Sequence, residues 1–192
     1  MNKKIILASQ SPRRKQLLEW AEIPFEIIVQ PTDETYPENI PIHDVPVHIA
    51  LHKARAIQTS LTDKQKQLPI LAADTIVVLK DKIIGKPKNR EDAINILSDL
   101  SGHQHRVITG VVIMRDIKEI SFSDSTDVYF HELNREQIEF YVDKYKPYDK
   151  AGAYAIQEWI GVVGIRSVKG DFYNVMGLPV SRVVKELEKM GG

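Results

Sequence analysis

The sequence predicts an α/β fold, because short apolar runs typical of buried strands alternate with amphipathic helix patterns along the chain. The first such pair is an apolar run at residues 3–8 followed by helical spacing at residues 13–22. The most apolar run, residues 69–79, lacks polar alternation, which indicates a strand covered on both faces. No internal repeat, linker or low-complexity segment divides the 192 residues, so we predict one domain over residues 1–192.

The composition is that of an ordinary globular protein and excludes several functional classes. Lys+Arg and Asp+Glu balance at 26 each, so no net field attracts nucleic acid or an anionic membrane, and we expect neither as a partner. The absence of cysteine excludes disulfides, thiolate zinc sites and cysteine nucleophiles. No apolar run approaches the roughly 18 residues that span a bilayer. The apolar run near the N-terminus is also too short for a signal peptide, so we expect a cytoplasmic location.

A polar turn at residues 9–14 (SQSPRR) joins the first predicted strand to the first helix. Ser11 suits the N-cap and Pro12 the first helical position, where its missing N–H costs nothing. A helix N-terminus binds anions through free N–H groups and its positive dipole end. Arg13 and Arg14 are unfavourable in that first turn unless an anion is present, which indicates a polyphosphate cradle. A capped surface helix with solvated arginines fits the same residues.

A strand is predicted at residues 24–30, and a loop follows at residues 31–46, which contain four prolines. A loop of this length inside a compact domain is usually functional or disordered. Its carboxylates could reach a metal held over a phosphate site. For Glu34 we keep this interpretation beside that of a solvated acidic loop, whereas Glu38 fits the solvated loop better.

The next predicted helix, residues 47–61, carries a lysine inside its apolar stripe. Lys53 either extends its ammonium group to the rim of that stripe or directs it at an anion in a cleft. His48 and His52 lie one turn apart, as metal ligands can. They lack the glutamate of the zinc-protease pattern and a nearby third ligand, so we do not assign them a metal.

The strand predicted at residues 69–79 contains Asp74 and Thr75 between two apolar stretches. An ionised carboxylate in such a strand costs several kcal/mol unless it is paired, hydrogen-bonded or bound to metal. Asp74 is therefore the strongest catalytic candidate in the chain. The alternative is a turn that breaks the strand here, or a purely local capping role.

Further elements follow from the same patterns. Residues 81–82 form a hairpin tip before Gly85-Lys86-Pro87, where the glycine permits close backbone approach and Lys86 is either a phosphate-directed ammonium or an exposed lysine. Helices are predicted at 90–100, at 135–145 and after the segment 177–179, and strands at 103–114, 117–130 and 160–168.

The segment 149–157 (DKAGAYAIQ) is unusual for its small residues, which permit close approach of a ligand or of another backbone. Gln157 ends the segment with an amide that both donates and accepts hydrogen bonds. A uracil or thymine edge offers a matching set, a ring N–H between carbonyls. Tight packing of a helix against the sheet fits the small residues equally well.

Together these blocks resemble the Maf family of nucleotide pyrophosphatases, once described as septum-formation inhibitors. The matching blocks follow the family order over nearly the whole chain: residues 9–14, Lys53-Ala54, residues 73–77, residues 85–87, Ser101-Gly102 with His105, Val107, Thr109 and Gly110, residues 149–157, and residues 174–179.

The resemblance implies an α/β fold with an elongated mixed β-sheet flanked by helices, and two lobes with an active-site cleft between them. It implies metal-dependent hydrolysis of nucleoside triphosphates to the monophosphate and diphosphate, by a homodimer. The aspartate that matches Asp74 is essential in the family, where it is described as the proton acceptor. Arg13, Thr75 and Gln157 resemble the branch that cleaves dTTP and UTP rather than the branch that acts on 7-methyl-GTP.

Site roles follow from the residues and the resemblance together. We expect Asp74 to be catalytic, either taking a proton from the attacking water or holding the metal that acidifies it. The residues expected to bind the substrate are Ser9, Ser11, Arg13, Arg14, Lys53, Thr75, Lys86 and Gln157. A divalent cation, Mg²⁺ or Mn²⁺, would be held by Asp74 and Glu34. The competing function is a non-catalytic nucleotide sensor that regulates cell division and septum formation.

Overall fold

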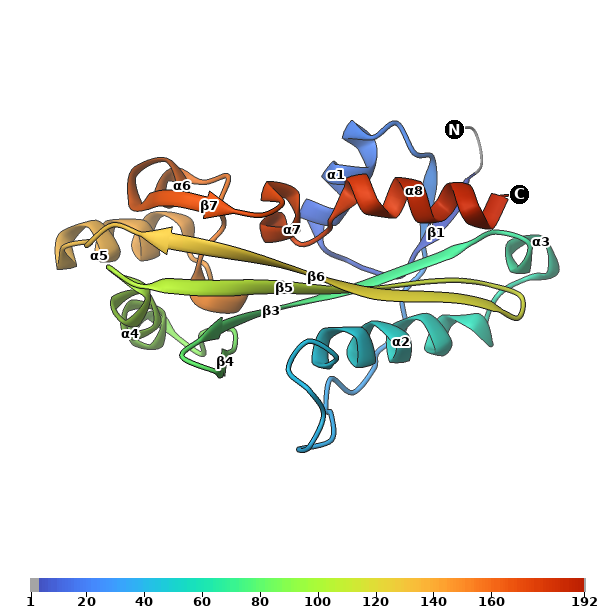
Figure 1. Cartoon of the computed structure of the whole chain (residues 1–192), viewed down its shortest axis with the longest axis horizontal. Coiled ribbons are helices and arrows are strands. Elements are labelled where there is room, and N and C mark those ends of the chain that lie inside the picture. Colours follow the sequence, from blue (N-terminus) through green and yellow to red (C-terminus); the bar gives the residue numbers. More distant parts are fainter. Residues whose placement is uncertain (1–3, 192) are drawn as a thin grey trace. The chain divides into compact units, whose positions relative to one another are not determined.

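The computed structural model describes residues 4–191 and confirms the α/β fold class (Figure 1). Within this range seven strands form one sheet, in the order β2-β1-β3-β5-β6-β7, with β4 paired to β3. The strands are β1 (Ile5–Leu7), β2 (Phe25–Ile27), β3 (Ile70–Leu79), β4 (Lys82–Ile84), β5 (Gln104–Arg115), β6 (Lys118–Phe130) and β7 (Ile165–Lys169). Parallel pairing of β1 with β2 and β3, and antiparallel pairing of β3 with β4 and of β6 with β7, make the sheet mixed, as predicted.

The helices are α1 (Pro12–Trp20), α2 (Val45–Gln58), α3 (Asp63–Lys66), α4 (Arg90–Leu100), α5 (Arg135–Tyr145), α6 (Trp159–Gly164), α7 (Phe172–Met176) and α8 (Val180–Gly191), with a 3₁₀ turn, η1 (Ala151–Ala153). None of the described helices is long and apolar enough to cross a membrane. Lys3, the first residue of the strand predicted at 3–8, lies outside the described residues.

The strand predicted at residues 160–168 is partly wrong, because its first half forms α6 and only Ile165–Lys169 is a strand. The run of apolar residues suggested burial on a sheet. Val162, however, is 81% exposed, so this stretch does not place its valines in a core. Because Gly161 has no side chain, the first turn of α6 can pack directly against the backbone of Ile156.

The chain divides into two compact units, and β3, β5 and β6 each contribute residues to both. The first unit comprises residues 1–74, 109–124 and 177–192, and the second comprises residues 75–108 and 125–176.

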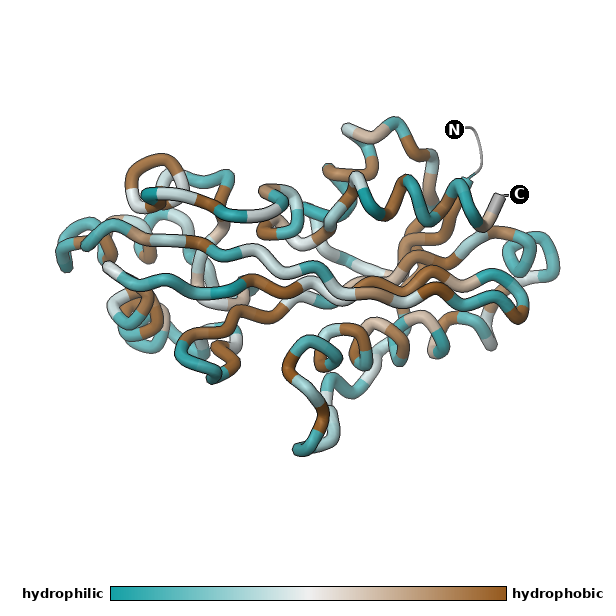
Figure 2. Tube along the Cα trace, viewed as in Figure 1, coloured by the Kyte–Doolittle hydropathy of each residue, from teal (hydrophilic) through white to brown (hydrophobic). Residues whose placement is uncertain are grey.

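In the first unit, α2 covers one face of the local strands, while α1 and α8 cover the other (Figure 1). The core on the α2 side joins residues of β1, β3, β5 and α2, among them Ile6, Ala50, Ala54 and Val112, and Figure 2 shows apolar residues concentrated along these strands. Gly110 on β5 fixes how closely α2 approaches, because a Cβ there would lie 2.2 Å from the backbone nitrogen of Val47. This close approach sets the height of α2, and therefore of Lys53, above the strands.

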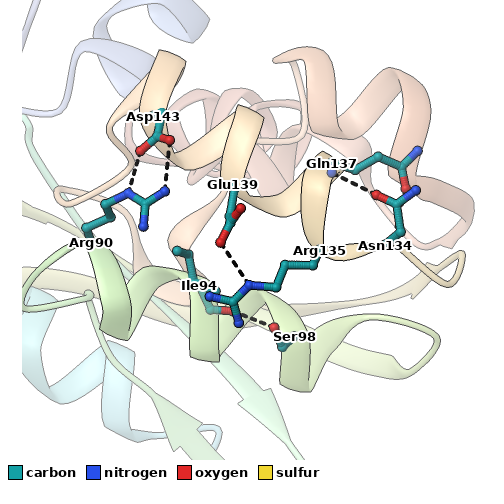
Figure 3. A network of polar contacts seen from close by, with 8 residues as sticks. All are labelled: Arg90, Ile94, Ser98, Asn134, Arg135, Gln137, Glu139 and Asp143. Carbon is teal, nitrogen blue, oxygen red and sulfur yellow. Dashed lines mark hydrogen bonds and ion pairs between the residues drawn. The ribbon is translucent and has the colours of Figure 1, made fainter.

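In the second unit, α4 and α5 pack together and are linked at their surface by polar contacts (Figure 3). Arg90 donates two hydrogen bonds to Asp143, from Nε to Oδ1 at 2.6 Å and from Nη2 to Oδ2 at 2.9 Å. Asn134 and Gln137 form a capping box that starts α5 by satisfying its first free N–H groups. These contacts hold α5 in place and with it the buried side chain of Tyr141.

Candidate active site

The turn between β1 and α1 is built as the sequence predicts. Ser11 is the N-cap of α1, since its Oγ accepts a hydrogen bond from the backbone N–H of Arg14 at 3.5 Å, and Pro12 occupies the first helical position. The N–H of Ser11 donates in turn to Ser9 Oγ at 3.2 Å. The turn is therefore ordered by its own serines at the N-terminus of a helix, where anions are favoured.

Arg14 is buried under this turn rather than solvated. Its Nη1 donates to Ser9 Oγ at 3.0 Å and its Nε donates to the carbonyl oxygen of Gly177 at 2.8 Å. Burial lowers the pKa of the Arg14 guanidinium, and Asp74 acts in the opposite direction by stabilising the charged form. The alternative of solvated arginines is therefore wrong for Arg14. Arg13 is half-buried on the same first turn.

The second cluster of the first unit joins three charged side chains from α2, β3 and the proline-rich loop. Lys53 Nζ lies 2.7 Å from Asp74 Oδ1 and 2.7 Å from Glu34 Oε1. The side chains of Lys53 and Asp74 are only 18% and 15% exposed, whereas that of Glu34 is 50% exposed. The Lys53 ammonium therefore does not extend into solvent. It also does not lack a counter-charge, because it pairs with two carboxylates.

Asp74 lies in the middle of β3, which continues without a break through it, so the alternative of a turn at this position is wrong. Ala73 before it is fully buried. The carboxylate is retained in an apolar strand because the ammonium of Lys53 pairs with it and the buried guanidinium of Arg14 lies within electrostatic reach. Ser9, Arg14, Lys53, Glu34 and Asp74 therefore form one polar region of the first unit.

The remaining predicted site residues belong to the second unit. Thr75 is half-buried on β3, while Lys86 and Gln157 are exposed. The segment of Lys86 and the small-residue segment meet, since the N–H of Gly152 donates to the carbonyl oxygen of Gly85 at 3.2 Å. Residues 152–156 are buried, and Gln157 is the first exposed residue after them.

Sequence reasoning missed the buried polar groups that hold the segment 152–157 in place. Tyr154 pairs with the buried His105, their Oη and Nε2 atoms 2.7 Å apart. Tyr141 on α5 contacts both Ala155 and Glu158. The apolar periodicity of α5 marks Tyr141 as a core residue, but no local pattern shows what its hydroxyl binds.

Among residues 4–191 no group of three or more His, Cys, Asp or Glu side chains could hold a metal ion. The rings of His48 and His52 have their centroids 4.2 Å apart and are tilted by 48°, and no third ligand joins them among residues 4–191. Asp74 and Glu34 still fit a Mg²⁺-type cation, because their oxygens converge on one point and such an ion completes its shell with water and phosphate.

Comparisons with known proteins agree with this description. A family profile described as "Maf-like protein" matches residues 4–190. The "dTTP/UTP pyrophosphatase" of Parabacteroides distasonis is 48% identical over 186 residues, which cover 96% of this chain and 95% of the relative. The protein of the same name from Cytophaga hutchinsonii is 49% identical over 189 residues, covering 98% and 85%.

Among solved structures, that of the Staphylococcus aureus Ham1 protein is similar with a TM-score of 0.50 and 16% identity, covering 96% of this chain and 100% of that chain. At this identity the likeness concerns the fold alone.

Proposed function

Because the chain belongs to the Maf family, we propose that it is a nucleoside triphosphate pyrophosphatase that hydrolyses dTTP and UTP to the monophosphate and diphosphate. Relatives named for this activity are 43% to 49% identical to the chain. The observation in the structure that carries the proposal is the shielded carboxylate of Asp74, which contacts the Lys53 ammonium at 2.7 Å near the buried guanidinium of Arg14.

The reaction needs charge neutralisation and a positioned water. A water oxygen forms a bond to the α-phosphorus, and the bond from the α-phosphorus to the bridging oxygen of the β-phosphate breaks, which releases diphosphate. Asp74 accepts the proton of that water. The cations that offset the triphosphate charge are Arg13, Arg14, Lys53 and Lys86. A divalent cation, Mg²⁺ or Mn²⁺, held by Asp74 and Glu34 would add to this neutralisation when bound.

The nucleobase is assigned to Gln157, with Arg13 and Thr75 as further specificity residues. Gln157 is exposed at the end of a buried segment, so its amide is available to a ligand while its backbone is held. An amide that donates to a carbonyl and accepts from a ring N–H matches the edge of uracil or thymine. The amino group and unprotonated ring nitrogen of cytosine reverse that pattern.

A nucleotide panel tests the proposal. Purified protein is incubated with Mg²⁺ and dTTP, UTP, CTP, ATP, GTP or 7-methyl-GTP, and the monophosphate and diphosphate are quantified. We expect both products from dTTP and UTP at the highest kcat/KM. Turnover of 7-methyl-GTP alone would overturn the base assignment, and binding without any turnover would support the nucleotide sensor instead.

Three further expectations stay predictions: a single functional domain over residues 1–192, a homodimer, and a cytoplasmic location without nucleic-acid or membrane partners. Light scattering in solution would measure the mass of the assembly, and salt-dependent binding of duplex DNA would contradict the expected absence of a nucleic-acid partner.

A further inference from the structure

Gln157 lies in a tight turn, Ala155 to Glu158, whose two ends are joined both by a backbone hydrogen bond and by the hydroxyl of Tyr141. The N–H of Glu158 donates to the carbonyl oxygen of Ala155 at 3.1 Å. The hydroxyl of Tyr141 spans the same two residues, because it accepts a hydrogen bond from the N–H of Ala155 at 3.1 Å and donates a short one to Glu158 Oε2. Tyr141 is fully buried, so its hydroxyl cannot exchange these partners for bulk water.

The other side of the turn rests on the backbone of α6. A Cβ at Gly161 would lie 1.7 Å from the carbonyl oxygen of Ile156, the residue immediately before Gln157. No real side chain tolerates that distance, so the turn can occupy its position only because residue 161 is glycine. The N–H of Gly161 also donates to the carbonyl oxygen of Glu158 at 2.9 Å. Gln157 is therefore held between a phenol and a helix backbone.

The segment leading into the turn is fixed in the same manner. Tyr154 is anchored on His105 at 2.7 Å, with Phe130 edge-on to both rings. Gly152 has a φ of +71°, and a Cβ there would meet Val77 Cγ2 at 3.0 Å. The exposed residue Gln157 therefore follows a backbone segment that is buried and held by hydrogen bonds.

We propose that Tyr141 and Gly161 are positioning residues for base selection, which act by fixing the turn that carries Gln157. This inference rests on the proposed function, in which Gln157 reads a uracil or thymine edge. A hydrogen-bonding subsite rejects the wrong base only if its donor and acceptor are held within a fraction of an ångström. A glutamine side chain has three rotatable bonds, so its backbone must supply much of that precision. Neither Tyr141 nor Gly161 contacts substrate in this proposal.

Two variants test it from opposite sides of the turn. Tyr141→Phe removes the hydroxyl and keeps the ring, while Gly161→Ala removes no hydrogen-bonding group and inserts one methyl group against the carbonyl oxygen of Ile156. We expect the ratio of kcat/KM for dTTP over CTP to fall by about tenfold or more in each, mainly through a higher KM for dTTP. The kcat at saturating dTTP should stay within about threefold, because the residues assigned to the phosphates are unchanged.

Matched controls use the same substitutions on neighbouring residues. Tyr145→Phe deletes the hydroxyl of the ring that stacks on Tyr141, with centroids 4.9 Å apart. Gly164→Ala adds a methyl group to the same helix, where its nearest neighbours would be side-chain atoms of Leu133 and Ile160 at 3.2 Å or more. Both should keep the wild-type ratio. Melting curves establish that each protein is folded at the assay temperature, and Gly161→Ala carries the test if Tyr141→Phe does not fold.

A double-mutant cycle separates positioning from general stability. In a Gln157→Ala background, where the amide is gone, Tyr141→Phe and Gly161→Ala should no longer change the dTTP to CTP ratio. An unchanged ratio in both single variants, or an equal loss with and without Gln157, would overturn this inference alone. A wild-type protein that hydrolyses neither dTTP nor UTP would overturn the proposed function and the inference with it.

Discussion

One polar cluster in each unit shows a different way of holding polar side chains. In the first unit formal charges meet, with Lys53 bound to Asp74 and Glu34 at 2.7 Å each and all three side chains partly exposed. In the second unit a neutral pair, His105 and Tyr154, is buried at a similar distance of 2.7 Å. The cluster around Lys53 is therefore ionic and accessible to solvent, whereas the pair of His105 and Tyr154 is neutral and buried away from solvent.

The difference concerns which contacts can be exchanged. A charged pair at the edge of solvent can release one partner to a phosphate or a cation, because the newcomer supplies the compensating charge. A sealed neutral pair has no replacement partner, so breaking it leaves an unsatisfied buried group. We therefore expect substitutions in the charged cluster of Lys53, Asp74 and Glu34 to alter turnover and cation dependence, and substitutions of the buried polar residues of the second unit to alter stability or base selection.

The largest expected effect belongs to Asp74→Asn. The amide of asparagine neither accepts a proton near neutral pH nor carries charge, so kcat for dTTP should fall by about 10²- to 10⁴-fold. Nucleotide binding, measured by calorimetry, should change far less because the cations remain. Asp63→Asn, at an exposed position in the same unit, is the control and should keep full turnover. If Asp74→Asn retained more than a tenth of the wild-type kcat, the charge cluster would have only a structural role.

A pH effect on stability is expected from the second unit. Burial lowers the pKa of His105 from an ordinary value of 6.5 to about 4. Between these values the unfolded chain binds a proton that the folded chain does not, so the free energy of unfolding falls as the pH falls through this window. The total loss is about 3 kcal/mol. Burial raises the pKa of Tyr154, so this partner stays neutral over the same range.

Urea unfolding at pH 7 and at pH 4.5 measures this effect. The wild type should lose more stability between the two pH values than His105→Gln, which has no imidazole to protonate. His103→Gln, at an exposed position two residues away on the chain, should behave like the wild type. Equal losses in the wild type and in His105→Gln would contradict the sealed character of this pair.

Periodicity was sufficient to predict most elements of the fold. The bounds predicted for α4 and α5 agree with the structure, because both helices carry strong amphipathic patterns. The four-residue α3 and the five-residue α7 were missed, since so few residues give no period to detect. At α6 valines suggested a strand where the structure has a helix with an exposed Val162. The family resemblance drawn from the sequence blocks is confirmed.

The candidate site was predictable only where its geometry is local. Ser11 as a cap follows from its position beside Pro12 and the helix. The partners of Lys53 were not predictable, because Glu34 and Asp74 come from a distant loop and strand. The contact of Tyr141 with Glu158 spans 17 residues, and nothing within either segment encodes it. The assigned roles of the site residues remain predictions.

The smallest effect tests whether the charges of the first unit exchange partners. Lys53→Met leaves Asp74 and Glu34 without their shared ammonium, so we expect the free energy of unfolding to fall by about 2 kcal/mol in buffer with a chelator. Millimolar Mg²⁺ should raise the melting temperature of this variant more than that of the wild type, because the cation takes the place of the ammonium between the same oxygens. Lys66→Met, which removes an exposed lysine beside Asp63, should show no such extra dependence on Mg²⁺. Identical Mg²⁺ shifts in the wild type and in Lys53→Met would mean that the two carboxylates do not hold a cation, and the charged cluster would then be as fixed as the neutral pair of the second unit.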